Sequence, residues 1–459
     1  MKLTANFFHN NFPLLLSLLI ISCDSKYELD LNNIEEIGSE SNNNFPSIGI
    51  NTFGEKIIDE PKINAQLIHI EDAIETEYNI GIEIRGSSSQ MFPKISYGFE
   101  SKNNDYSEEM DIALGGFPEE EDWILYGPYS DKSLIRNKLS FDLSNAIGYP
   151  ASRTKFYDLN LNGDFMGVYV LMEKIKRDKN RVDISKTNDD ALDSGYIIKI
   201  DKPTGDGELC STCYDESFSF RSNFDKNGNS SESSNIFFIY HYPKPDNITD
   251  EQKDFIFSIV NEFETNLLSD YFDDPEIGYE SLIDIDSFID FFIINELTKN
   301  PDAYRLSTFL NRDTMGKLKM GPVWDFNLAF GNVDYCDGMN TEGWVYNFNS
   351  ICPSDFWQVP FWWNRLMESD NFKSKLKNRW VSLRLNQLSN TSIFNMINHY
   401  NEYLNSNKSI SRNFNKWPIL GQYIWPNYFV GESHESEIDF IKQWITNRLL
   451  WMDGKINNF

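Results

Sequence analysis

The sequence predicts an α+β fold of two lobes, with a strand-rich N-terminal half and a helical C-terminal half. Up to about residue 200, short runs alternate apolar and polar side chains between Gly, Ser and Asn turns. From about residue 250, apolar side chains recur every three or four positions, which is the helical period. The chain has 459 residues, 15% of them aromatic, so it can bury one large core or two ordinary ones.

The strands are predicted in the first half of the chain. A strong hairpin signal, Asn162-Gly163, separates two of them, because this pair suits the left-handed backbone of a tight turn. The predicted strands are residues 48–52, 62–70, 78–84, 95–100, 155–161, 167–173 and 195–201.

The first helix is predicted over residues 131–147. Ser130 or Asp131 is suited to cap its N-terminus, and Gly148 follows its last apolar residue. Later helical patterns cover residues 250–263, 287–297 and 437–452. Between them lies an irregular segment rich in tryptophan, whose side chains suit either a packed core or a sugar-stacking surface.

The N-terminus is typical of a bacterial lipoprotein. Lys2 precedes an apolar stretch over residues 12–21 that is too short to cross a bilayer. It ends in Ser22-Cys23, a small residue followed by the cysteine whose thiolate takes the lipid. We expect residues 1–23 to be a lipoprotein signal with its lipidation site at Cys23. An ordinary secretory signal with a coincidental cysteine is the alternative.

The predicted location follows from that signal. The polar stretch at residues 24–45 is suited to a flexible tether. The protein is expected in the bacterial cell envelope, periplasmic or at the outer surface, and held to the membrane through its lipid. A net charge of −29 argues against nucleic acid as a partner, because phosphate binding needs a basic surface.

Four cysteines follow the lipidation site. An even number in an exported protein favours disulfides, most simply Cys210–Cys213 and Cys336–Cys352. The first pair, in a CxxC arrangement, is also compatible with a redox pair or with half of a zinc site.

Two aspartates lie in settings suited to chemistry. Asp302 follows Asn300-Pro301 and is therefore expected in a loop. Asp325 ends a short apolar run and precedes Phe326, which is how protein kinases present a magnesium-binding aspartate. A pair of turn aspartates that cap neighbouring elements would show the same spacing.

Five segments of the chain follow one another in a distinctive order. They are RGSS with FPKISY at residues 85–97, WILYGPY with SLIRN at 123–137, NGDFMGVYVLME at 162–173, Asp302, and GPVWDF at 321–326. In these segments and their order, the chain resembles the spore coat protein H (CotH) kinase family over residues 48–343.

The resemblance implies an atypical protein-kinase-like fold over residues 46–343, with the helical, Trp-rich residues 344–459 packed on the same domain. It implies transfer of a phosphoryl group from ATP to a Ser or Thr of a protein substrate, with Mg²⁺ or Mn²⁺. In this reading Asp302 is the catalytic aspartate and Asp325 the metal ligand. The implied nucleotide-binding residues are Arg85, Lys94 and Glu173.

The sequence departs from protein kinases at three points. It has no GxGxxG, it has Ser307 where kinases place a metal-binding Asn, and residues 131–147 contain no Glu to pair with Lys94. The alternative prediction is therefore a catalytically inactive kinase-fold lipoprotein that acts as a binding or scaffold protein, with carbohydrate as one candidate ligand.

Overall fold

The computed structural model describes residues 45–188, 191–204 and 210–459. The chain divides into two compact units, residues 1–40 and 41–459, and every described residue belongs to the second. The predicted lipidation site Cys23 and residues 24–44 of the predicted tether lie outside the described residues.

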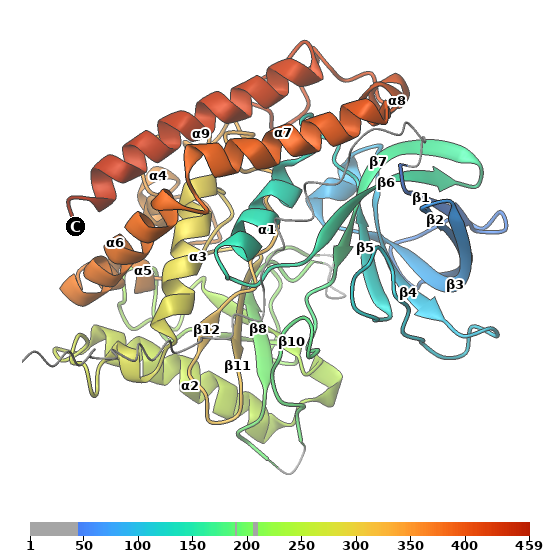
Figure 1. Cartoon of the computed structure of the whole chain (residues 1–459). Helices are drawn as coiled ribbons and strands as arrows, with labels where there is room; N and C mark the ends of the chain where they lie inside the picture. The colour runs from blue at the N-terminus through green and yellow to red at the C-terminus, as the bar shows by residue number, and fades with distance from the viewer. Residues whose placement is uncertain (1–44, 189–190, 205–209) are drawn as a thin grey trace, which may run out of the picture. The chain divides into compact units, whose positions relative to one another are not determined.

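The first part of the described chain is a closed barrel (Figure 1). Its neighbouring strands are antiparallel except for β1 and β6, which run parallel and close the barrel. In barrel order the strands are β1 (Ser47–Asn51), β2 (Ile63–Glu71), β3 (Ile74–Arg85), β4 (Ser96–Lys102), β5 (Asp122–Tyr126), β7 (Asp164–Glu173) and β6 (Thr154–Leu161).

The hairpin between β6 and β7 is the predicted one. Asn162 and Gly163 both have positive φ, 52° and 88°, as a two-residue turn between antiparallel strands requires. Asparagine tolerates this conformation and glycine adopts it without cost.

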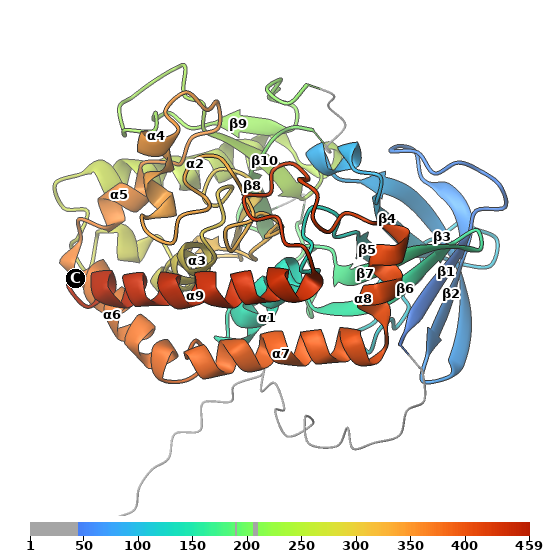
Figure 2. The ribbon, with the colours of Figure 1, turned by 90° about the horizontal axis from the view of Figure 1, so that it is seen from above.

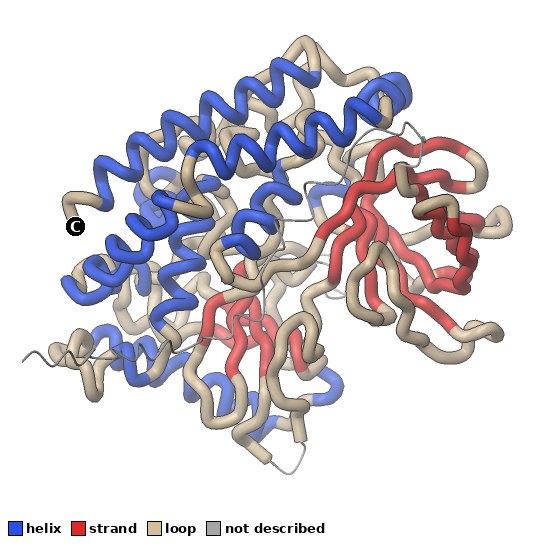
Figure 3. The backbone as a smooth tube through the Cα atoms, in the orientation of Figure 1, coloured by secondary structure: helices blue, strands red, loops and turns tan. Residues whose placement is uncertain are grey.

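A second sheet of five strands lies apart from the barrel, as the two groups of strands in Figure 3 show. Its central strand, β8 (Tyr196–Ile200), is fully buried. In sheet order the strands are β12 (Lys319–Met320), β11 (Thr308–Arg312), β8, β10 (Phe237–Tyr242) and β9 (Ser219–Arg221).

The helices follow in the second half of the chain, apart from α1 (Arg136–Ala146). The central one, α3 (Ile285–Thr298), packs against α1, α6 and α9, and every residue from Phe288 to its end is buried. Helices α7 and α9 lie side by side in both Figures 1 and 2. The remaining helices are α2 (Asp250–Leu268), α4 (Phe348–Ile351), α5 (Trp362–Leu366), α6 (Asp370–Leu385), α7 (Asn390–Ser406), α8 (Ser409–Lys416) and α9 (His434–Ile456).

Short 3-10 turns complete the fold: η2 (Ser88–Met91), η3 (Pro245–Asn247), η4 (Tyr279–Ser281) and η5 (Val345–Asn347). Within the described ranges, no helix is long and apolar enough to cross a membrane. The predicted α+β organisation, strands first and helices later, is confirmed.

Helix α1 begins five residues later than the predicted residue 131. Its N-cap is Ile135, which makes no side-chain cap. Asp131 instead folds a tight turn: its carboxylate accepts hydrogen bonds from the backbone N–H groups of Ser133 (3.1 Å) and Arg136 (2.9 Å). The predicted capping residue thus satisfies the first helical N–H from a turn outside the helix.

Both predicted disulfides are present, Cys210–Cys213 and Cys336–Cys352. The tryptophan segment is largely core. Trp362 and Trp363 are 0% and 1% exposed, so these two rings cannot stack on a sugar at the surface. Trp362 Nε1 donates a hydrogen bond to the carboxylate of Glu264 on α2, at 2.9 Å.

Candidate functional site

Asp302 lies in the loop between α3 and β11, and its partner is a buried arginine. Arg305 Nη2 donates to Asp302 Oδ1 at 2.9 Å, and Arg305 Nη1 contacts Asp355 Oδ1 at 3.4 Å. The guanidinium also donates from Nε to the Pro301 carbonyl (3.0 Å) and stacks on the Phe348 ring at 3.9 Å. The Asp302 carboxylate is therefore fixed in direction while a fifth of its side chain remains accessible (20%).

Asp325 follows β12 and has left-handed backbone, with φ +62°. Its side chain keeps some accessible surface. The pKa of its carboxyl group is raised to about 7, first by burial and then by the negative charges of Asp302 and Asp201. The positive charges of Lys202 and Arg85 act in the opposite direction.

The structure thus brings Asp302 and Asp325 together, and it adds two residues that the sequence analysis missed, Asp201 and Lys202. They directly follow β8, and Lys199 on that strand pairs with Asp201 at 3.4 Å. The sequence signal that could have identified them is their position, since both are charged and lie at the end of the predicted strand 195–201. Two acids, Asp302 and Asp201, and two cations, Lys202 and Arg85, therefore act on the charge of Asp325.

Arg85 ends β3, and its guanidinium lies 5.9 Å from the ring centre of Trp324, the residue before Asp325. The turn after Arg85 reaches the segment after β8, since the hydroxyls of Ser87 and Thr204 are 2.9 Å apart. Arg85 and the turn that follows it therefore lie on the side of the barrel that faces Asp325.

Lys94 precedes β4 and is only 2% exposed. Its ammonium donates to Asn413 Oδ1 of α8 at 2.8 Å and to the Pro128 carbonyl at 3.4 Å, and it lies 5.2 Å from the Tyr169 ring centre. Burial holds the pKa of Lys94 well below its usual range. The acids that act on this ammonium are Asp158 and Asp131.

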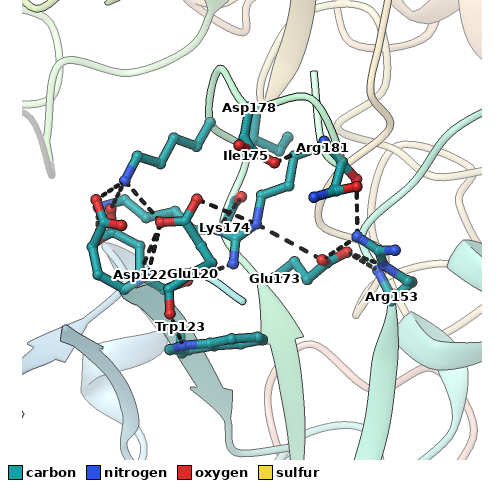
Figure 4. A network of polar contacts seen from close by, with 12 residues as sticks. Glu120, Asp122, Trp123, Arg153, Glu173, Lys174, Ile175, Asp178 and Arg181 are labelled. Atoms are coloured by element: carbon teal, nitrogen blue, oxygen red, sulfur yellow. Dashed lines mark hydrogen bonds and ion pairs between the residues drawn. The ribbon is translucent and has the colours of Figure 1, made fainter. Parts of the chain in front are cut away.

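Glu173 ends β7 inside a network of ion pairs (Figure 4). Its carboxylate accepts from Arg153 Nη2 at 2.6 Å and from Arg153 Nε at 2.9 Å, and Arg181 Nε lies 3.8 Å away. With 4% of its side chain exposed, Glu173 already has its charge matched by these arginines.

The same network borders an acidic group of Asp111, Glu120 and Glu121. The Lys176 ammonium already bonds Glu120 at 2.9 Å and contacts Glu121, so this group has its own cation. Asp302, Asp325 and Asp201 do not form such a close group of three ligands among the described residues. A metal ion at Asp325 would therefore take part of its oxygen ligands from phosphate groups.

The residues around Asp325 fit a divalent cation and phosphate groups. Mg²⁺ and Mn²⁺ prefer oxygen ligands. A bound cation also relieves the repulsion between neighbouring carboxylates. Arg85 and Lys202 are the nearby cations that can contact phosphate oxygens. Phosphoryl transfer requires that the reacting groups are positioned and that the phosphate charge is neutralised. The carboxylates and cations around Asp325 are residue types suited to these two tasks.

A family model described as CotH kinase protein matches residues 82–452, most of the chain. The match includes both aspartates, Arg85, Lys94 and Glu173, and it continues through α7 into α9. No curated protein matches the chain.

Proposed function

The chain belongs to the CotH kinase family, and we propose that it is an atypical protein kinase. In this proposal it transfers the γ-phosphoryl group of ATP to a Ser or Thr hydroxyl of a protein substrate. The observation that carries the proposal is that Asp302 and Asp325 lie close enough for their charges to interact. The acid Asp201 and the cations Arg85 and Lys202 act on the same carboxyl group.

Asp302 is proposed to orient the acceptor hydroxyl and to accept its proton. Its ion pair with Arg305 supports this role, because a carboxylate held by a buried arginine keeps one direction. Arg305 is in turn held by Asp355 and by the Phe348 ring. One oxygen of Asp302 is used in this pair, which leaves the other for an acceptor.

Asp325 is the proposed metal ligand, with Asp201 as a second carboxylate nearby. Bound Mg²⁺ or Mn²⁺ would neutralise phosphate charge. Arg85 and Lys202 are proposed to contact the phosphates directly. Lys94 and Glu173, which the family resemblance also assigns to the nucleotide, have buried partners of their own.

Thermal unfolding with and without ATP tests this proposal. A ligand at a hundred times its Kd adds about 2.7 kcal/mol to the free energy of unfolding. We expect ATP with Mn²⁺ to stabilise residues 44–459, and Asp325→Ala to remove the part that depends on the metal. Asp250→Ala, at an exposed aspartate in the first turn of α2, is the control and should respond as the unchanged protein does. A protein indifferent to ATP and Mn²⁺ would instead support a kinase-fold binding or scaffold lipoprotein.

We also propose that the protein is held in the cell envelope through lipid on Cys23. The motivating observation is the apolar run that ends in Ser22-Cys23. Labelled palmitate should be incorporated by the full-length chain and not by Cys23→Ala. Equal labelling of both chains would contradict the anchor and leave the kinase proposal untouched.

A further inference from the structure

We propose that Asn137 and Asn300 are positioning residues for Asp325. Both hold the same peptide unit, the one that joins Asp325 to Phe326. Asn300 Nδ2 donates to the Asp325 carbonyl at 2.9 Å, and the Phe326 N–H donates to Asn137 Oδ1 at 2.6 Å. We call these two residues the asparagine pair.

The asparagine pair joins three parts of the fold. Asn137 lies in the first turn of α1, Asn300 lies in the loop after α3, and the peptide unit follows β12. Asn300 also reaches the other aspartate, because its Oδ1 accepts the Asp302 N–H at 3.3 Å. One amide side chain therefore connects the backbones of Asp302 and Asp325.

The bonds of the asparagine pair are made away from water. Asn137 is 3% and Asn300 2% exposed. A buried amide that loses its partner cannot turn to solvent, so the free energy cost of a rotated peptide unit is high. Both bonds thus favour one orientation of the plane between Asp325 and Phe326.

The conformation of Asp325 explains why such support is needed. A non-glycine residue with φ +62° is disfavoured, and this conformation persists where surrounding contacts fix it. Fixing the peptide plane after Asp325 fixes the backbone at this residue, and with it the direction in which the side chain leaves the backbone. The inference rests on the proposed function in one respect: the aimed carboxylate is taken to be the metal ligand.

The test compares Asn137→Ala and Asn300→Ala with two matched controls. Asn145→Ala removes a comparable bond from the far end of α1, where Asn145 Oδ1 accepts the Ala151 N–H at 2.9 Å. Asn349→Ala removes an amide that bonds both the N–H and the carbonyl of Val359, each at 2.8 Å. These controls lose the same kind of hydrogen bond without touching either aspartate.

The first measurement is Mn²⁺ affinity in the presence of ADP, from the electron paramagnetic resonance signal of free Mn²⁺. We expect each variant of the asparagine pair to weaken binding at least about tenfold, as loss of a supporting hydrogen bond around a metal ligand does. The controls should lower the melting temperature similarly but keep the affinity. Unchanged affinity in Asn137→Ala and Asn300→Ala would overturn the proposal.

The second measurement is hydrogen exchange of the Phe326 amide, which needs neither metal nor nucleotide. Asn300→Ala should speed this exchange at least about tenfold, although Asn300 does not bond that N–H, because both residues hold one peptide unit. If the unchanged protein binds no Mn²⁺, the proposed function fails. The exchange rate of the Phe326 amide then tests by itself whether the asparagine pair holds this peptide unit. Exchange in Asn300→Ala as slow as in the unchanged protein would overturn the asparagine pair.

Discussion

The two aspartates differ in the neighbours that the fold provides. Asp302 has the guanidinium of Arg305 at 2.9 Å. Asp325 has no such ion pair among the described residues, and the negative charges of Asp302 and Asp201 act on it more strongly than the positive charges of Lys202 and Arg85. A carboxylate among other carboxylates gains most from a cation, and one held by an arginine is suited to orient a substrate group. This difference is the residue-level basis for the two proposed roles.

Sequence reasoning located both aspartates because each follows a recognisable local pattern, a proline turn or a strand end. It did not locate the asparagine pair. The bond of Asn137 to Phe326 joins positions 189 apart, and that of Asn300 to Asp325 joins positions 25 apart. No local spacing encodes such contacts, since they arise only when α1 packs beside the loop.

Glu264 provides a prediction about pH that is independent of the proposed site. It lies in α2, is 1% exposed, and accepts hydrogen bonds from Ser222 Oγ at 2.8 Å and Trp362 Nε1 at 2.9 Å. Its pKa is raised from 4.5 to about 7 because the effect of burial exceeds the opposing effect of the two hydrogen bonds. The folded protein therefore keeps this proton at a pH where the unfolded chain has lost it.

Stability should consequently fall as pH rises from about 4.5 to about 7, because the folded state binds more protons. The loss amounts to about 3 kcal/mol for a shift of this size. Glu264→Gln, which has no proton to lose, should match the unchanged protein at pH 5 in urea unfolding and exceed it at pH 8. Parallel pH curves for the two proteins would show that Glu264 does not titrate in this way.

At the scale of elements, local signals predicted β1 to β4 and β6 to β8. The Asn162-Gly163 hairpin is the clearest case. The strands β5, β9, β10 and β11 lie outside the predicted ranges. Closure of the barrel was not predictable, because β1 pairs with β6 across more than 100 residues of chain. The start of α1 was predicted five residues too early. The Asp131 carboxylate forms a turn before the helix and an ion pair with the Arg136 guanidinium at 2.6 Å, so Asp131 does not cap the helix directly.

The contact of α8 with the barrel leads to a prediction about Lys94. Asn413 Oδ1 accepts from Lys94 and also from the Val168 N–H at 3.1 Å. Asn413→Ala leaves the buried ammonium without this acceptor and should cost about 3 kcal/mol in urea unfolding. Lys94→Met removes the charge and keeps the volume, so its stability should change by less than about 1 kcal/mol.

Metal and nucleotide binding provide the control for this pair. A packing role for Lys94 predicts that Lys94→Met binds ATP with Mn²⁺ as the unchanged protein does. A large loss of ATP affinity in a stable Lys94→Met protein would instead support the phosphate contact that the family resemblance implies.

The two disulfides should contribute unequally to stability. Cys336–Cys352 closes a separation of 16 residues and Cys210–Cys213 one of 3. Loop-closure entropy predicts about 3 kcal/mol for the longer loop and about 2 kcal/mol for the shorter. Urea unfolding of the two double Cys→Ser variants measures this. A larger loss from the Cys210–Cys213 pair would contradict an entropic origin.

At the scale of the whole molecule, the candidate site draws on both sheets and on the helices. Arg85 comes from the barrel, Asp201 and Lys202 from the segment after β8, and Asp302 from the loop after α3. The family match over residues 82–452 spans all of them and extends past the predicted domain end at residue 343. Sequence motifs identified the family, but only the fold shows that these charges share one place.

The most direct measurement of the central claim is transfer of label from γ-labelled ATP to protein, with Mn²⁺ or Mg²⁺ and residues 44–459. The account predicts labelled protein that Asp302→Asn and Asp325→Ala both abolish while circular dichroism shows that they remain folded. Asp250→Ala should label as the unchanged protein does. Absence of label, or label that persists in Asp325→Ala, would contradict the proposed phosphotransferase.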